Sequence, residues 1–82
     1  MIILDDEIIL AAPLFSSIWQ IRCQPGDIIE TGNEVLIILE AMKTEILFKA
    51  GAKHIGKTIK GLAKGVKAGE SVAAGDALVI LK

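Results

Sequence analysis

The chain has 82 residues, of which 52% are hydrophobic but only 4% aromatic, so its core must be built from aliphatic side chains. This length fits one small domain or a piece of a longer protein. A net charge of -1 excludes a strongly basic nucleic-acid-binding protein. The single cysteine, Cys23, excludes an intrachain disulfide framework, and the single histidine, His54, argues against a metal site or a Ser-His-Asp triad.

No membrane-spanning or targeting segment is predicted. The longest uninterrupted apolar run, Val35–Leu39, is far shorter than the ~20 residues that a helix needs to cross a bilayer. The first apolar run follows no basic region and is interrupted by Asp5, Asp6 and Glu7, which is unlike a secretory signal. We therefore expect a cytoplasmic protein whose partners include neither membranes nor nucleic acids.

The apolar runs are short and are separated by turn signals, which is typical of β-strands joined by tight turns. Candidate strands lie at residues 8–10, 18–23, 28–29, 35–39 and 46–48. Glycines recur every few residues from Gly51 onward, and each interior glycine costs a helix about 1 kcal/mol relative to alanine. The pattern therefore predicts an all-β sandwich or barrel.

The sequence contains an internal repeat. Residues 26–38 align with residues 69–81 at a constant offset of 43 without a gap, and the identical pairs are Gly26/Gly69, Gly32/Gly75 and Ile37/Ile80. Two such copies predict one domain with approximate two-fold symmetry, in which each copy covers the apolar face of the other. The alternative is two ordinary hairpins of similar composition.

A short polar segment, Glu40–Glu45, lies between the two copies and joins two candidate strands. A strand–turn–strand interpretation puts Met42 and Lys43 at the tip of a hairpin. Neither residue is of the Asn-Gly or Asp-Gly type that two-residue hairpins prefer. Because sequence rules tend to fail where function overrides them, the tip is a candidate functional site. The alternative is a solvated lysine flanked by two glutamates.

The segment Glu40–Glu45 reads Glu-Ala-Met-Lys-Thr-Glu and resembles the biotin attachment motif of biotinyl carrier domains. The resemblance covers residues 11–81. Residues 1–10 have no family equivalent and are expected to be an N-terminal extension or an extra strand, which leaves residues 11–82 as the carrier domain. The matching positions outside the motif are Ala12–Pro13, Pro25–Asp27, Gly32, Gly69–Glu70 and Gly75–Asp76.

The resemblance implies a flattened β-sandwich of two four-stranded sheets with a quasi-two-fold axis, the fold that biotinyl and lipoyl domains share. It implies that biotin is attached covalently to Lys43. The biotin would carry CO2 as carboxybiotin from a biotin carboxylase to a carboxyltransferase, so the domain itself catalyses neither step. The residues expected to be recognised by a biotin protein ligase are Glu40, Ala41, Met42, Thr44 and Glu45.

Within that family, the motif with Thr44 and the segment Ile18–Ile21 before Pro25 are most similar to the carrier domains of urea carboxylase and urea amidolyase. One alternative is a lipoyl-type carrier, although lipoyl domains usually have Asp where Met42 stands. Another is a biotinyl-like module that only binds proteins. The segment Gly51–Thr58 also fits the phosphate-binding P-loop pattern, but residues 59–65 are poor helix formers, so nucleotide binding is not expected.

Overall fold

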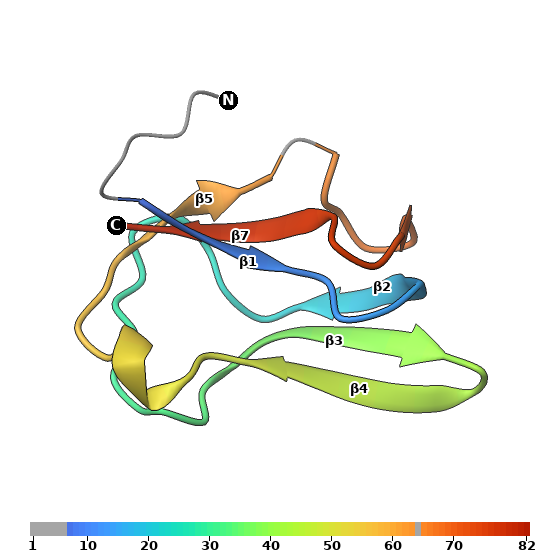
Figure 1. Cartoon of the computed structure of the whole chain (residues 1–82), viewed down its shortest axis with the longest axis horizontal. Helices are drawn as coiled ribbons and strands as arrows, with labels where there is room; N and C mark the ends of the chain where they lie inside the picture. Colours follow the sequence, from blue (N-terminus) through green and yellow to red (C-terminus); the bar gives the residue numbers. More distant parts are fainter. Residues whose placement is uncertain (1–6, 64) are drawn as a thin grey trace.

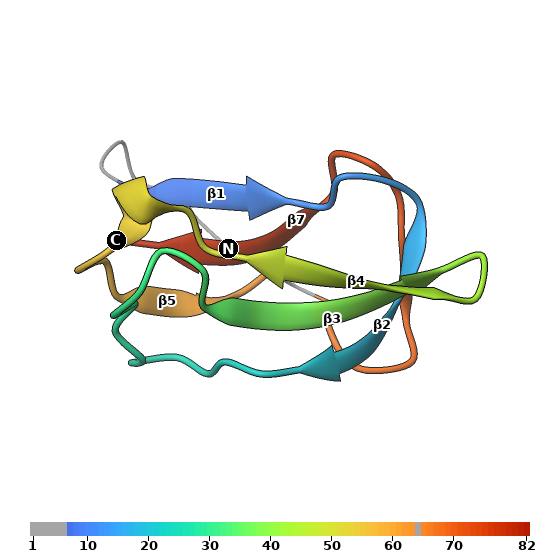
Figure 2. The ribbon, with the colours of Figure 1, turned by 90° about the horizontal axis from the view of Figure 1, so that it is seen from below.

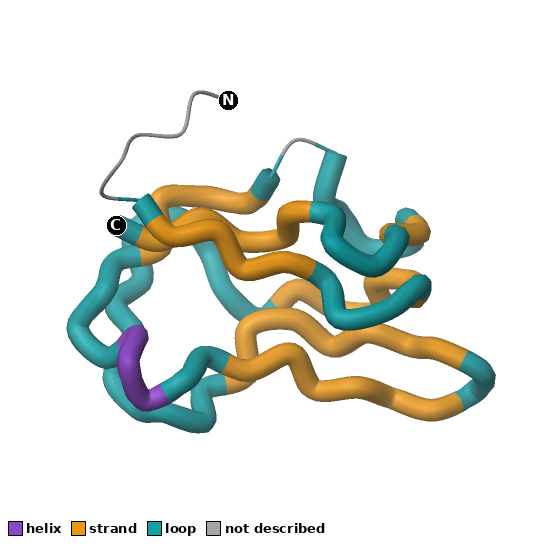
Figure 3. The backbone as a smooth tube through the Cα atoms, in the orientation of Figure 1, coloured by secondary structure: helices purple, strands orange, loops and turns teal. Residues whose placement is uncertain are grey.

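The computed structural model of the chain describes residues 7–63 and 65–82, which form two antiparallel β-sheets (Figure 1). The smaller sheet has the strand order β1-β7-β5 and the larger sheet the order β4-β3-β2-β6. The strands in these residues are β1 (Ile8–Ala11), β2 (Ser16–Ile21), β3 (Val35–Ala41), β4 (Thr44–Lys49), β5 (Ile59–Leu62), β6 (Ser71–Val72) and β7 (Ala77–Leu81). One 3-10 turn, η1 (Ala52–His54), follows β4 (Figure 3).

The two sheets lie face to face as two layers and enclose the core between them (Figures 1 and 2). The largest fully buried side chains come from both sheets and include Ile18, Leu36, Ile37, Leu39, Ile59, Leu78 and Leu81. No aromatic side chain is among the buried ones in the described part of the chain, as the composition predicts. The predicted all-β sandwich with an aliphatic core is therefore confirmed.

The smaller sheet has three strands where four are predicted. The place beside β5 is taken by an isolated antiparallel bridge between Ile28 and Thr58. In the larger sheet the corresponding place is filled by β6, which is only two residues long. The two sheets thus follow one plan and differ in how far an edge segment stays paired. Strand β1 pairs with β7 and forms one edge of the smaller sheet. It spans residues 10 and 11, between which the N-terminal extension was expected to end and the carrier domain to begin.

The internal repeat is present in the fold, but its predicted register is wrong by one residue in the buried strands. Each of β3 and β7 carries a bulge, at Leu36 and at Leu78, so these two residues are equivalent at an offset of 42. A slip of one residue moves a side chain to the opposite face of a strand. Ile37, aligned with Ile80 on sequence, accordingly belongs to the core cluster, whereas Ile80 lies outside it and is equivalent to Ile38.

The segment Gly51–Thr58 does not form a P-loop. Thr58 leads into β5 and not into a helix, so no row of helix N–H groups is available to bind phosphate. His54 is buried, and its Nδ1 accepts a hydrogen bond of 2.9 Å from the N–H of Gly51. This histidine therefore stabilises the turn through its side chain.

Candidate functional site at the hairpin tip

Strands β3 and β4 form a hairpin that stays paired up to its turn. The register joins Glu40 to Glu45 and Ala41 to Thr44, so the connection consists of Met42 and Lys43 alone. In both ribbon views this turn projects beyond the rest of the molecule (Figures 1 and 2). The structure thus places Met42 and Lys43 at a hairpin tip, as the sequence predicts.

The backbone of the tip is strained. The φ angle is 51° at Met42 and 66° at Lys43, and no other non-glycine residue of the described chain has a positive φ. Positive φ at both central positions is the pattern of a type I′ turn, whose twist matches that of the flanking strands. An L-amino acid in this region costs about 1–2 kcal/mol, which Asn-Gly would largely avoid. Two non-glycine residues at such positions make the tip a candidate functional site.

Both side chains of the tip are presented to solvent. Met42 is 97% exposed. The Lys43 side chain is exposed and forms no hydrogen bond or ion pair with any residue that the structure describes. Its amine is therefore held away from the body of the domain on a base that the two paired strands fix. Such an arrangement suits a lysine that must be reached by another protein.

The flanking residues surround the tip in two cross-strand pairs. Glu40, Thr44 and Glu45 are exposed and Ala41 is half-buried. Glu40 and Glu45 lie directly opposite each other, and like charges in this relation destabilise a sheet. Neither carboxylate has an ion-pair partner among residues 7–63 and 65–82. The fold therefore gathers all five residues expected to be recognised by a ligase around Lys43.

Two aromatic residues of the neighbouring region were not predicted as part of the site. Ser17 of β2 pairs with Glu40, and the residues two positions to either side of Ser17 are Phe15 and Trp19. They are 69% and 55% exposed, whereas Ile18 is buried. Because alternate residues of a strand share a face, this pattern puts both aromatic rings on the outer face of the larger sheet. The structure thus places Trp19 on the surface and not in the core.

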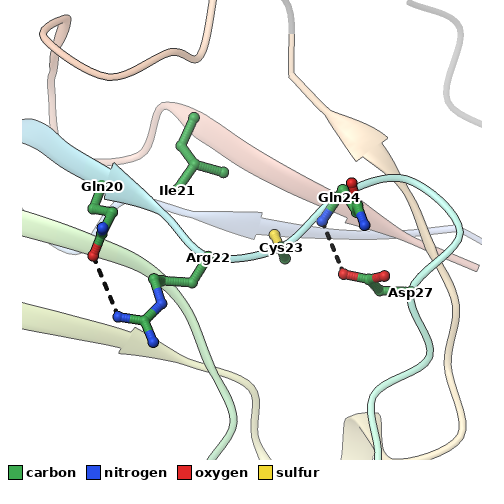
Figure 4. A pocket seen from close by; sticks show the side chains of 6 residues that line it. All are labelled: Gln20, Ile21, Arg22, Cys23, Gln24 and Asp27. Atoms are coloured by element: carbon green, nitrogen blue, oxygen red, sulfur yellow. Dashed lines mark hydrogen bonds between the residues drawn. The ribbon is translucent and has the colours of Figure 1, made fainter.

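One hollow on the surface lies away from the hairpin tip. It has a volume of about 380 Å³ and is lined by residues from the end of β2 and the segment that follows it, namely Gln20, Ile21, Arg22, Cys23, Gln24 and Asp27 (Figure 4). Burial raises the pKa of the Cys23 thiol to about 11, and the charges of Asp27 and Glu34 add to this effect. A thiol is a weak nucleophile while it stays protonated. The hollow therefore offers no reactive group at neutral pH.

The described residues contain no helix that is both long and apolar enough to cross a membrane.

No family model matches the sequence. Among curated proteins, the chain is similar to a protein of Emericella nidulans named "Putative urea carboxylase", with 32% identity over 79 residues. The match covers 95% of this chain but only 6% of that relative, so the chain corresponds to a small part of it.

Among solved structures, the fold is similar to part of a single-chain, multi-domain long-chain acyl-CoA carboxylase, with a TM-score of 0.81 and 22% sequence identity. That match covers 100% of this chain and 8% of the carboxylase chain. The resemblance to a carboxylase domain predicted from the sequence is therefore confirmed, by sequence in one carboxylase and by fold in another.

Proposed function

We propose that the chain is a biotin carboxyl carrier domain and that Lys43 is its attachment residue. The observation that carries the proposal is the strained tip, where a free lysine in a Glu-Ala-Met-Lys segment is held outward by a paired hairpin. The similarity to segments of two carboxylases supports it. The domain would supply no catalytic group of its own and would act as a tethered carrier between a biotin carboxylase and a carboxyltransferase.

The modification would be an acylation of the Lys43 amine by a biotin protein ligase. The neutral amine attacks the carbonyl of biotinyl-adenylate, an amide bond forms, AMP leaves and the amine gives up a proton. The net charge of the domain changes from -1 to -2, because the ammonium is lost. Tethering then raises the effective concentration of biotin at both partner enzymes without the need for tight binding at either.

We further propose a urea carboxylase as the parent enzyme. The supporting observation is the identity of 32% to a protein of that name. A carboxylation assay would test this: the biotinylated domain is added to a urea carboxylase whose own carrier lysine is replaced. Restored carboxylation of urea, and not of a short acyl-CoA, is the expected result. An acyl-CoA carboxylase whose own carrier lysine is replaced serves as the parallel assay. Restored activity in that enzyme and not in the urea carboxylase would contradict the assignment.

The carrier role is tested by the intact mass of the chain after incubation with a biotin protein ligase, ATP and biotin. The wild type should gain one biotinyl group and Lys43→Arg none. Lys49→Arg is the matched control, because Lys49 is an exposed lysine of the same hairpin. It should be biotinylated like the wild type. Biotin on the Lys43→Arg chain would move the site to another lysine.

A lipoyl-type carrier and an unmodified protein-binding module are the competing functions. Incubation with a lipoyl ligase, ATP and lipoate separates them. Met42 supports biotin over lipoate, because its side chain is fully presented at the position where lipoyl domains carry an acidic residue. A chain that is folded by circular dichroism but accepts neither group would leave only the protein-binding module.

A further inference from the structure

The outer faces of the two sheets have the same layout. In the smaller sheet Ile80 of β7 lies between Ile9 of β1 and Gly61 of β5. In the larger sheet Ile38 of β3 lies between Leu47 of β4 and Gln20 of β2. Both central isoleucines are almost fully buried yet lie outside the core cluster.

The bulges extend this equivalence to two further positions. The strand next to each central isoleucine carries one extra residue, Lys60 in β5 and Trp19 in β2. Glu7 stands two residues before Ile9 and Glu45 stands two residues before Leu47, so Glu7 is equivalent to Glu45. The two outer faces can therefore be compared residue by residue.

The outer face of the smaller sheet carries an ion pair. Lys60 Nζ lies 2.7 Å from Glu7 Oε2, and the Glu7 side chain is only 3% exposed. The larger sheet has Trp19 in the place of Lys60 and Glu45 in the place of Glu7. It also has Glu40 where the smaller sheet has Lys82. Two basic residues are thus replaced by a tryptophan and a glutamate.

This exchange puts an exposed tryptophan beside two carboxylates on the outer face of the larger sheet. Trp19 is 55% exposed and Leu47 is 48% exposed, on either side of Ile38. The carboxylates of Glu40 and Glu45 stand beside them without a cation from the described chain. An exposed tryptophan next to unpaired carboxylates fits a basic side chain from outside, which the ring can stack upon and the carboxylates can neutralise.

We propose that this face is the docking surface for the biotin protein ligase, and that a lysine or arginine of the ligase takes the place that Lys60 occupies in the smaller sheet. The proposal rests on the proposed function. It assigns Trp19 and Leu47 an apolar contact and Glu45 an ion pair with the ligase. Because Glu45 is two residues from Lys43, docking here would orient the tip toward the ligase active site.

The test is the steady-state kinetics of biotinylation with the unmodified chain as the varied substrate. Trp19→Ala should raise KM about tenfold and Glu45→Gln about threefold, with kcat changed less than about twofold, because the contacts serve binding and not chemistry. Ile9→Ala and Glu30→Gln are the matched controls. Ile9 is the equivalent of Leu47 on the smaller sheet. Glu30 has an exposed carboxylate and lies in the loop that joins β2 to β3. Both should keep the wild-type KM.

A second variant separates docking from folding. Trp19→Lys reproduces the Lys60 and Glu7 arrangement within the larger sheet, so it should keep or raise the thermal stability while it raises KM. KM values within about twofold of the wild type for Trp19→Ala, Glu45→Gln and Trp19→Lys would overturn the docking surface. A wild-type chain that takes no biotin at any ligase concentration would instead overturn the proposed function, so the two failures are distinguishable.

Discussion

Gly26 and Gly69 occupy equivalent positions in the two halves of the fold. Their φ angles are 96° and 94°, and the N–H of each donates a hydrogen bond of 2.8 Å to a buried isoleucine carbonyl, Ile59 for Gly26 and Ile18 for Gly69. The N–H of each isoleucine in turn donates to the residue after the glycine. A Cβ added at either glycine would meet no heavy atom within 4 Å. Backbone conformation alone therefore explains both glycines.

Gly26→Ala and Gly69→Ala should each lower the free energy of unfolding by about 1 kcal/mol, because alanine is disfavoured at positive φ. Urea denaturation measures this. Gly32→Ala is the steric control: its φ is not positive, and the added Cβ would lie 3.0 Å from the Cα of Ala52. Unchanged stability in Gly26→Ala and Gly69→Ala would contradict the role of φ.

Replacing Met42-Lys43 by Asn-Gly should stabilise the domain by about 1–2 kcal/mol, since both new residues accept a positive φ at lower cost. The same variant should no longer accept biotin. Thermal denaturation and intact mass, measured on the same sample, check the two effects. A variant that is less stable than the wild type would show that the tip is not strained.

Lys60→Met should cost about 2 kcal/mol, because it removes an ion pair from the carboxylate of Glu7, which is only 3% exposed. Lys67→Met is the matched control. Lys67 and Glu70 are 3.8 Å apart and both largely exposed, so its loss should change stability by about 0.5 kcal/mol or less. Equal effects of the two substitutions in chemical denaturation would argue against the ion pair as a stabilising feature of the smaller sheet.

The stability of the domain should fall between about pH 9 and pH 11. The Cys23 thiol titrates at about 9 when unfolded and at about 11 when folded. The unfolded chain therefore releases this proton first, and the stabilisation present below pH 9 is lost as the pH rises through 11. Cys23→Ala removes this contribution, so the unfolding free energy of the variant should decline less over the same pH range. Equal declines would contradict the buried thiol.

The tip could be predicted because a motif and a hairpin pattern agreed on the same residues, Met42 and Lys43. The composition of the core could be predicted, since aliphatic side chains are many and aromatic ones few. The register of the repeat could not. A gap-free alignment rewarded the identity of Ile37 and Ile80, while the shorter turn in the second copy and the bulges at Leu36 and Leu78 depend on tertiary pairing.

The outer face was also beyond sequence reasoning. Trp19 sits in a β-rich stretch where core and surface positions alternate, and the bulge between Ile18 and Gln20 interrupts that alternation. Its relation to Glu45 arises only because β2 and β4 flank β3. The same holds for His54, whose hydrogen bond from Gly51 depends on the geometry of the 3-10 turn.

The described chain ends near the place where Ile8 pairs with Leu81, at the end of the molecule opposite the hairpin tip (Figure 1). The long dimension of the molecule is 34 Å. A neighbouring domain or protein that binds beside these paired residues therefore lies at the opposite end of the molecule from Lys43. A small rotation of the domain about that contact would displace Lys43 over a long distance. The two packed sheets would keep the direction of the hairpin tip fixed relative to the rest of the domain.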